Sequence, residues 1–148
     1  MPVMSGSILN WVAHSWNRLF TGKKLLPYER LVLDAWRASL LEEGQRTLDA
    51  QLEAVSFVQH QAGGAKVCFY YREDRGMPLF KLDRPDLHAA TVLLRAEGLE
   101  TLRARIFLHR GRFFSIEFPK RPNRYMQQHH MQERTLQVAS VENHVAIA

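Results

Sequence analysis

Cysteine is almost missing from this chain of 148 residues, because Cys68 is the only one. One cysteine cannot close an internal disulfide, and it argues against a zinc site built on several thiolates. No run of about 18 apolar residues occurs, so the sequence predicts no membrane-spanning helix. Eight glycines and six prolines are too few for a collagen-like chain. Because 46% of the residues are hydrophobic, we expect a folded globular protein. The single cysteine and the lack of a spanning run favour a cytoplasmic location.

Recognisable catalytic motifs are also missing. The chain contains no G-x-S-x-G nucleophile elbow, no H-E-x-x-H zinc pattern and no P-loop. His129, His130 and His144 could supply imidazole ligands to zinc, copper or nickel, but the adjacent pair has no partner at a metal-binding spacing. We therefore predict no metal, no cofactor and no catalytic residue, and the balance of these signals is against an enzyme.

Positive charge is concentrated near the end of the chain. The net charge of +5 arises from 20 basic and 15 acidic residues, and residues 101–148 contain eight of the basic and three of the acidic ones. A local excess of this kind attracts anionic partners and raises their encounter rate, whereas the alternative is a solvated, solubilising face. The predicted partner-binding residues of this basic hairpin are Arg103, Arg105, Arg110, Arg112, Lys120, Arg121 and Arg124.

The first segment, residues 1–24, is predicted to contain an amphipathic helix over 7–20. Its apolar surface is larger than one narrow stripe can bury, and such surfaces usually mark a partner contact. We expect an interaction helix that meets a protein partner or a second copy in a homodimer, and the alternative is a second helix that packs along the same sheet. Its polar face has few positive charges, which argues against membrane-surface contact. The interaction residues are Ile8, Trp11, Val12, Trp16 and Phe20.

A second helix is predicted over residues 27–43. Pro27 suits a first helical turn, and Gly44 suits the position after a helix end. Apolar side chains recur at helical spacing between these two residues, which is typical of a helix lying on a core.

The next residues carry an ambiguous pattern. Residues 47–61 alternate apolar and polar side chains, which favours one long strand. Leu48, Leu52 and Val55 also fit a helix, so both interpretations remain open for the first half of this segment. We favour the strand because β-type residues follow it.

Gly63-Gly64 predicts a hairpin between this strand and residues 65–72. Pairing across these glycines places Val58 opposite Phe69 and His60 opposite Val67. Because His60 falls on the apolar face, we expect it to be a hydrogen-bonded residue, and His60 and His109 are the candidates for a small-molecule pocket.

The second half of the chain predicts further strands. Residues 73–88 form a long connection with a short edge strand at 79–82, and alternation resumes over 90–96 and 102–109. Residues 136–141 fit either one more strand or an extended tail.

The last hairpin allows two registers. A two-residue turn at Arg110-Gly111 would mix apolar and polar faces. A three-residue loop over 110–112 keeps the faces separate, and we favour it because a one-residue slip exposes every apolar side chain. This choice pairs Ile106 with Ile116, Leu108 with Phe114, Ala104 with Phe118 and Arg105 with Glu117.

The order of these elements predicts an α+β fold, with N-terminal helices packed on a four- to five-stranded antiparallel meander sheet. The predicted division is 1–24, a core domain over 25–119 and a polar tail over 120–148. The helix-on-curved-sheet arrangement resembles cystatin-like folds and, more broadly, nuclear transport factor-like folds. Residues 59–63 (QHQAG) resemble the first-hairpin motif of cystatin inhibitors, but 109–112 (HRGR) lacks their Pro-Trp pair, which argues against protease inhibition.

Three functions remain open. The first is a non-enzymatic binding or assembly domain that meets protein or anionic partners. The second is a small-ligand-binding or catalytic cup of the nuclear transport factor-like type. The third is single-stranded nucleic-acid binding, because arginines for phosphate alternate with rings for base stacking in the last third of the chain.

Overall fold

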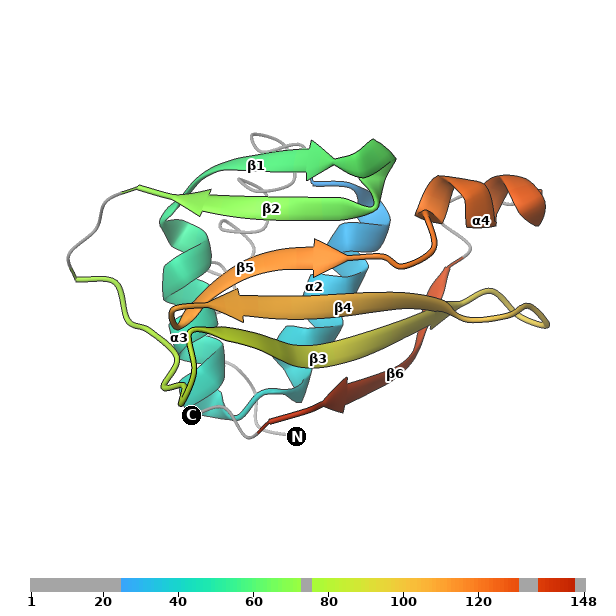
Figure 1. Cartoon of the computed structure of the whole chain (residues 1–148). Helices are drawn as coiled ribbons and strands as arrows, with labels where there is room; N and C mark the ends of the chain where they lie inside the picture. Colours follow the sequence, from blue (N-terminus) through green and yellow to red (C-terminus); the bar gives the residue numbers. More distant parts are fainter. Residues whose placement is uncertain (1–24, 73–75, 131–135, 146–148) are drawn as a thin grey trace, which may run out of the picture.

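The computed structural model describes residues 25–72, 76–130 and 136–145, in which two helices cover one face of a six-stranded antiparallel sheet (Figure 1). The α+β class is therefore confirmed. The helices are α2 (Pro27–Ser39), α3 (Glu42–Glu53) and α4 (Pro122–Gln128), with a short 3-10 turn η2 (Ala62–Gly64). The strands are β1 (Val55–Gln61), β2 (Lys66–Tyr71), β3 (Asp86–Arg95), β4 (Leu102–His109), β5 (Arg112–Glu117) and β6 (Gln137–Asn143).

The strand order differs from the predicted meander of four or five strands. The sheet runs β1-β2-β5-β4-β3-β6, so β2 pairs with β5 and the last strand pairs with β3. Val67 lies opposite Ile116, which joins the two hairpins through buried residues. Residues 137–143 thus form a sixth strand, and the extended-tail interpretation of this segment is wrong.

Two of the predicted boundaries are also wrong. The helix expected over 27–43 ends at Ser39, and residues 42–53 form the separate helix α3 instead of the first half of a strand. Glu42 and Glu43 lie in the first turn of α3, where carboxylates interact favourably with the helix dipole. Leu48 and Leu52 are buried at helical spacing, because α3 covers the part of the sheet that α2 does not reach.

The first hairpin has the predicted register. Val58 pairs with Phe69 and His60 pairs with Val67. Four residues, Ala62 to Ala65, connect the strands through η2. The edge strand expected at 79–82 is not formed, although Phe80 N–H donates to the Gly111 carbonyl at 2.8 Å.

The second hairpin combines the two registers that the sequence allowed. Arg105 pairs with Glu117 and Ile106 with Ile116, as predicted. A bulge then shifts the pairing, so Leu108 pairs with Phe113 and the expected contact with Phe114 is wrong. The connection is the two-residue turn Arg110-Gly111, whose φ angles of 50° and 78° suit a type I′ turn. The bulge lets the tight turn and the apolar alternation coexist.

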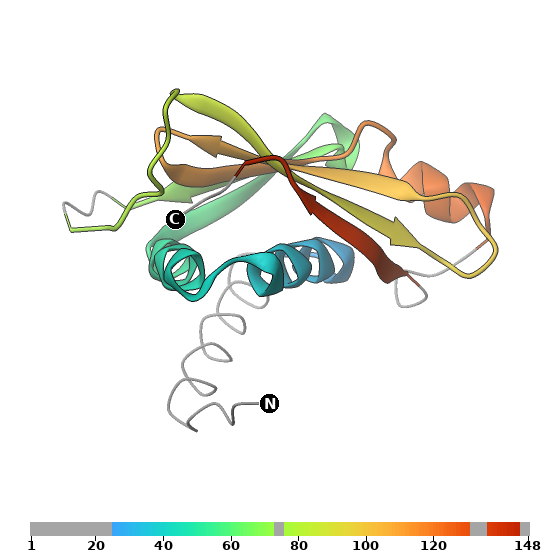
Figure 2. The same cartoon turned by 90° about the horizontal axis from the view of Figure 1, so that it is seen from below.

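The core lies between the helices and the inner face of the sheet (Figure 2). Trp36 of α2 is fully buried, and its ring centroid lies 5.6 Å from that of Phe113 and 6.0 Å from that of Phe80. Its indole N–H donates to the side-chain oxygen of Asn143 at 3.1 Å, which ties α2 to β6. The predicted interaction helix over 7–20 falls outside the described residues.

Candidate binding face of the sheet

The outer face of the sheet is the surface that points away from α2 and α3. None of the described helices packs on it, as Figure 2 shows. Strand alternation places one set of side chains there, since neighbours along a strand point to opposite faces. On β4, for example, Leu102, Ala104, Ile106 and Leu108 are buried on the inner face, whereas Arg103, Arg105, Phe107 and His109 point outward.

Aromatic side chains cross this outer face in a row. The Phe57 and Tyr70 rings stack with centroids 4.6 Å apart, and Tyr70 meets Phe114 edge-on at 6.4 Å. The His109 ring lies 5.7 Å from that of Phe114, two residues along β4 from Phe107. We call these residues, together with His88, the aromatic row: Phe57, Tyr70, Phe114, His109, Phe107 and His88.

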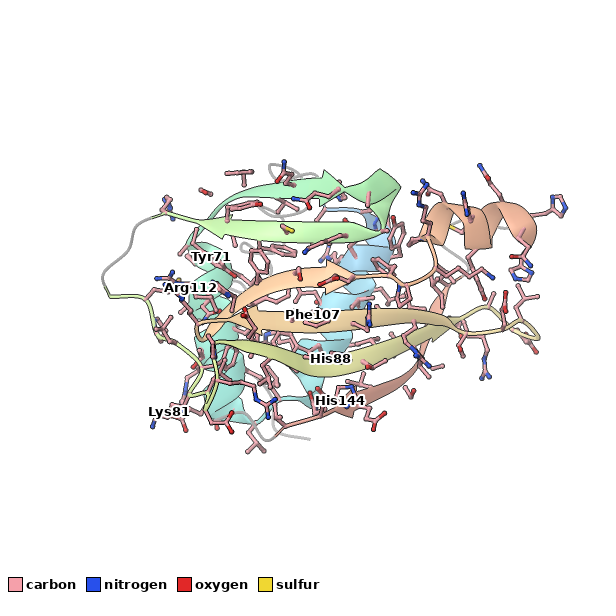
Figure 3. The ribbon with its side chains drawn as sticks, viewed as in Figure 1. Tyr71, Lys81, His88, Phe107, Arg112 and His144 are labelled. Atoms are coloured by element: carbon pink, nitrogen blue, oxygen red, sulfur yellow. The ribbon has the colours of Figure 1, made fainter. Side chains whose placement is uncertain are left out.

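The row ends at β3 and β6. Phe107 stacks on His88 with ring centroids 4.9 Å apart, and His88 lies 4.5 Å from His144. Figure 3 shows these three side chains next to one another across the sheet. Since β1, β2, β5, β4 and β3 each contribute a ring, the row crosses five of the six strands, a distance of roughly 19 Å at the usual strand spacing.

Basic side chains accompany the rings. The Lys66 ammonium lies 5.7 Å from the Phe114 ring centroid, and the Arg105 guanidinium carbon lies 5.7 Å from that of Phe107. Lys66 also approaches Glu117 at 4.0 Å. Arg103 and Arg105 form no ion pair within the described residues, and the buried Nε of Arg105 has no hydrogen-bond partner there. The N–H groups of these two guanidiniums can therefore donate hydrogen bonds to a ligand.

A hollow of about 350 Å³ opens on the outer face between β4, β3 and β6. We call it the β3–β6 hollow. Most of its polar wall consists of groups that can donate hydrogen bonds, and Glu142 is the exception. The wall residues that matter below are Arg103, Arg105, His88, His144, Thr91 and Glu142.

A hydrogen-bond chain joins the two histidines of this hollow. His88 Nε2 lies 3.1 Å from the Ala90 carbonyl oxygen, so this nitrogen carries a proton and donates. The Thr91 hydroxyl lies 3.2 Å from the same nitrogen and 2.7 Å from His144 Nε2. With neutral histidines, Thr91 accepts from His88 and donates to His144.

The pKa of His88 is lowered from its ordinary value. Burial is the largest cause, and the neighbouring His144 and Arg105 act in the same direction. The Ala90 carbonyl and Glu117 oppose them. His88 is therefore neutral near pH 7, with its Nδ1 unprotonated.

The predicted basic hairpin is divided among three places. Arg103 and Arg105 lie on the outer face, and Arg110 and Arg112 lie at the turn end of β4 and β5. The remaining members lie at the opposite end of β5, close to α4. There the Lys120 ammonium pairs with Glu100 at 2.7 Å, Arg121 precedes α4, and Arg124 lies within it.

The two histidines proposed for a pocket lie on opposite sides of the sheet. His60 points toward α2, where its Nε2 lies 2.8 Å from a carboxylate oxygen of the buried Glu29. His109 lies on the outer face and its Nδ1 contacts Asp86 at 2.5 Å. Neither lines the β3–β6 hollow, nor a second, more open hollow of about 340 Å³ beside Arg110 and Phe80.

Sequence reasoning did not select several residues of the outer face. Phe57 and Tyr70 come from β1 and β2, far from the basic segment, and His88 comes from β3. The sequence pattern suggests His144 only as a metal ligand. Alternation could have found Phe57 and Tyr70, which occupy outward positions of their strands. It would have placed His88 on the inner face, because a bulge between His88 and Ala90 shifts the alternation of β3. Their proximity depends on the strand order, which local patterns do not determine.

No known protein family, curated protein or solved structure matches this chain. No helix among the described residues is both long and apolar enough to cross a membrane. Within the same residues, no cluster of three or more His, Cys, Asp or Glu side chains could hold a metal ion.

Proposed function

We propose that this protein is a non-enzymatic binding domain whose partner is single-stranded nucleic acid, held on the outer face of the sheet. The observation that carries the proposal is the aromatic row, which lies beside Arg103 and Arg105, two residues with no ion pair in the described part of the chain. Proteins that bind single strands combine rings on which bases stack with cations that track the phosphates.

The exposure of the row supports this function. Phe57 is 51% exposed at one end, and the next rings along the row are half-buried, so their edges or faces reach solvent. A contiguous row of accessible rings, unlike a single exposed apolar residue, usually marks a partner surface. Each stacked base is worth about 1–3 kcal/mol, so two or three stacked bases would give a measurable affinity.

The charges of the face support an anionic partner. Each carboxylate on it has a basic neighbour: Glu117 lies near Lys66, Asp86 near His109 and Glu142 near His144. Arg103 and Arg105 remain available for phosphate. A guanidinium suits this task because its planar donors match phosphate oxygens.

The interior of the sheet gives less support to a ligand-binding or catalytic cup. Such a cup would need a deep polar cavity near His60 or His109. The inner face is instead packed with large apolar side chains of α2, α3 and the sheet, including Trp36, Tyr28 and Phe69. The broad cystatin-like or nuclear transport factor-like arrangement remains part of the proposal, supported by helices that cover one face of an antiparallel sheet.

Fluorescence anisotropy with labelled single-stranded DNA and RNA oligonucleotides tests this function. We expect saturable binding to the full chain that weakens steeply with salt, because neutralised phosphates release counterions. Changing Arg103 and Arg105 together to Gln should make the slope of log K against log salt shallower by about 1.4, the value for two phosphates of a single strand. Phe107→Ala and Phe57→Ala should each weaken binding about tenfold.

Two control variants lie on the helix side of the molecule. Arg46→Gln removes an exposed charge of α3, and Leu41→Ala removes an exposed apolar side chain before it. Both should bind like the parent. Absence of binding to every oligonucleotide, or equal effects of the outer-face and control variants, would refute the proposal and favour a protein partner.

The interaction helix remains a separate proposal. Ile8 and the other apolar residues of segment 1–24 would join two copies of the chain. The cytoplasmic location expected from the sequence is likewise part of what we propose. A homodimer would present two outer faces and would bind long oligonucleotides more tightly than short ones.

A further inference from the structure

The β3–β6 hollow concentrates hydrogen-bond donors at one end of the aromatic row. Arg103 and Arg105 lie two residues apart on β4, so both point outward and their Cα atoms are about 7 Å apart. His88 and Thr91 come from β3, while Ser140 and His144 come from β6 and the residues after it. Two consecutive strands and a third segment distant in sequence thus surround one concave site.

We propose that the β3–β6 hollow is a phosphate-binding site in which Arg103 and Arg105 hold the phosphate oxygens and His88 strengthens binding as the pH falls. This inference deepens the proposed function and rests on it for the source of the phosphate, which is then the bound strand. A free small phosphate has the same chemistry and is the other source to be tested.

Arg105 is held in place for this role before any ligand arrives. Its guanidinium packs against the Phe107 ring, and its Nε is buried without a hydrogen-bond partner in the described part of the chain. A guanidinium fixed in this way loses little freedom when it binds an anion. Charge-assisted hydrogen bonds from two arginines are strong enough for a specific site.

His88 connects binding to pH. His88 is neutral because burial, His144 and Arg105 disfavour its charged form, and Glu117 on β5 opposes them. A phosphate in the hollow would stabilise the imidazolium form, so the bound protein would take up a proton. Arg103 on β4 and Glu142 on β6 complete the charged groups that face this site.

A substitution of Glu142 should tighten phosphate binding instead of weakening it. Its carboxylate lines the hollow and lies 3.9 Å from His144 Nδ1, where it repels a bound phosphate. Glu142→Gln should therefore tighten phosphate binding about threefold, the effect of one unit charge about 6 Å away in a water-like dielectric. A nonspecific loss of structure would weaken binding instead.

Nuclear magnetic resonance of the full chain provides the measurement. Inorganic phosphate, and sulfate as an analogue that does not titrate in this range, are added at constant ionic strength while the histidine ring signals are followed. We expect saturable shifts at His88 and His144 but not at His60, which lies on the other side of the sheet. Sulfate binding should strengthen from about pH 7.5 to about pH 5.5.

Variants identify the contacts. Changing Arg103 and Arg105 to Gln should weaken phosphate binding at least about tenfold, while Arg46→Gln should leave it unchanged. His88→Gln should remove most of the pH dependence of sulfate binding. Uniform, unsaturable shifts, or equal affinity in the arginine variant and the parent, would overturn the inference.

Oligonucleotides then separate the two proposals. Strands that bind and are displaced by inorganic phosphate, with a 5′-phosphorylated strand binding more tightly than its unphosphorylated match, support both. Strands that bind while phosphate neither binds nor competes refute the phosphate site and leave the proposed function standing. Saturable phosphate binding without any oligonucleotide binding refutes the proposed function, and supports the hollow as a site for a free small phosphate.

Discussion

Gln51→Leu should destabilise the fold strongly, because this fully buried side chain of α3 makes three hydrogen bonds to the chain around the β4–β5 turn. Its amide nitrogen donates to the carbonyl oxygens of Pro78 at 3.0 Å and Gly111 at 2.9 Å. Its amide oxygen accepts the backbone N–H of Phe113 at 2.8 Å. The bulge next to Phe113 turns this N–H toward the helix instead of the neighbouring strand.

The size of the effect follows from these partners. The buried Phe113 N–H would have no acceptor, which costs about 2 kcal/mol. The Gly111 carbonyl would still accept the Phe80 N–H at 2.8 Å, and water can reach the partly buried Pro78 carbonyl. The loss of the two hydrogen bonds to these carbonyls therefore costs about 2 kcal/mol together. The leucine side chain buries more apolar surface than glutamine, which stabilises the fold by about 1 kcal/mol. We expect a net loss of about 3 kcal/mol in the free energy of unfolding.

Urea unfolding followed by circular dichroism measures this loss. Gln45→Leu is the matched control, because Gln45 lies on the same helix and its side chain makes one hydrogen bond within the described residues, to the Arg37 carbonyl at 3.1 Å. The control should lose less than about 1 kcal/mol. If Gln51→Leu loses no more than the control, the contacts of Gln51 do not hold the turn and the reasoning is wrong.

Four further outcomes are expected. Asp49→Asn should cost about 3 kcal/mol in unfolding free energy, because the largely buried Arg37 guanidinium loses a two-pronged ion pair with contacts of 2.6 and 2.7 Å; a loss below about 1 kcal/mol would contradict this. Gly111→Ala should lower Tm by several degrees in a thermal scan, because φ is +78° and a Cβ atom would lie 2.6 Å from a backbone oxygen; an unchanged Tm would argue against this turn. Burial lowers the pKa of His88, so the unfolded chain binds a proton at this histidine before the folded chain does, and stability falls as the pH drops below about 6.5. His88→Gln should flatten the pH dependence of the urea midpoint, and an unchanged profile would contradict this. Deleting residues 1–22 should leave a folded monomer by sedimentation, and an unfolded remnant from a monomeric parent would show that the segment belongs to the core.

Local patterns predicted pairing between strands close in sequence. Opposed apolar residues and the Gly63-Gly64 signal were sufficient for the register of β1 and β2, which the structure confirms. In the second hairpin the same reasoning predicted Ile106 opposite Ile116 but not the bulge. Alternation assumes one residue per strand position, whereas the Arg110-Gly111 turn requires one extra residue.

The mistake at residues 47–53 has a different cause. Leu48 and Leu52 are four residues apart. This spacing places them on one face of a helix and also on one face of a strand, so it does not distinguish the two. The sheet decides the matter, because its inner face extends beyond α2 and needs a second apolar cover. Tertiary packing of this kind overrides local preference.

The candidate binding face shows why function was harder to predict than secondary structure. Alternation tells which side of a strand Phe107 or Tyr70 occupies, but not which strands lie beside each other. The pairing of β2 with β5 brings Tyr70 next to Phe114, and the pairing of β6 with β3 brings His144 next to His88. Rings and donors scattered over nearly 90 residues become one surface only through these long-range pairings. If the surface binds nucleic acid, variants that disturb the β3–β6 pairing should weaken phosphate binding more than they weaken base stacking on Phe57, because Phe57 lies on β1 at the other edge of the sheet.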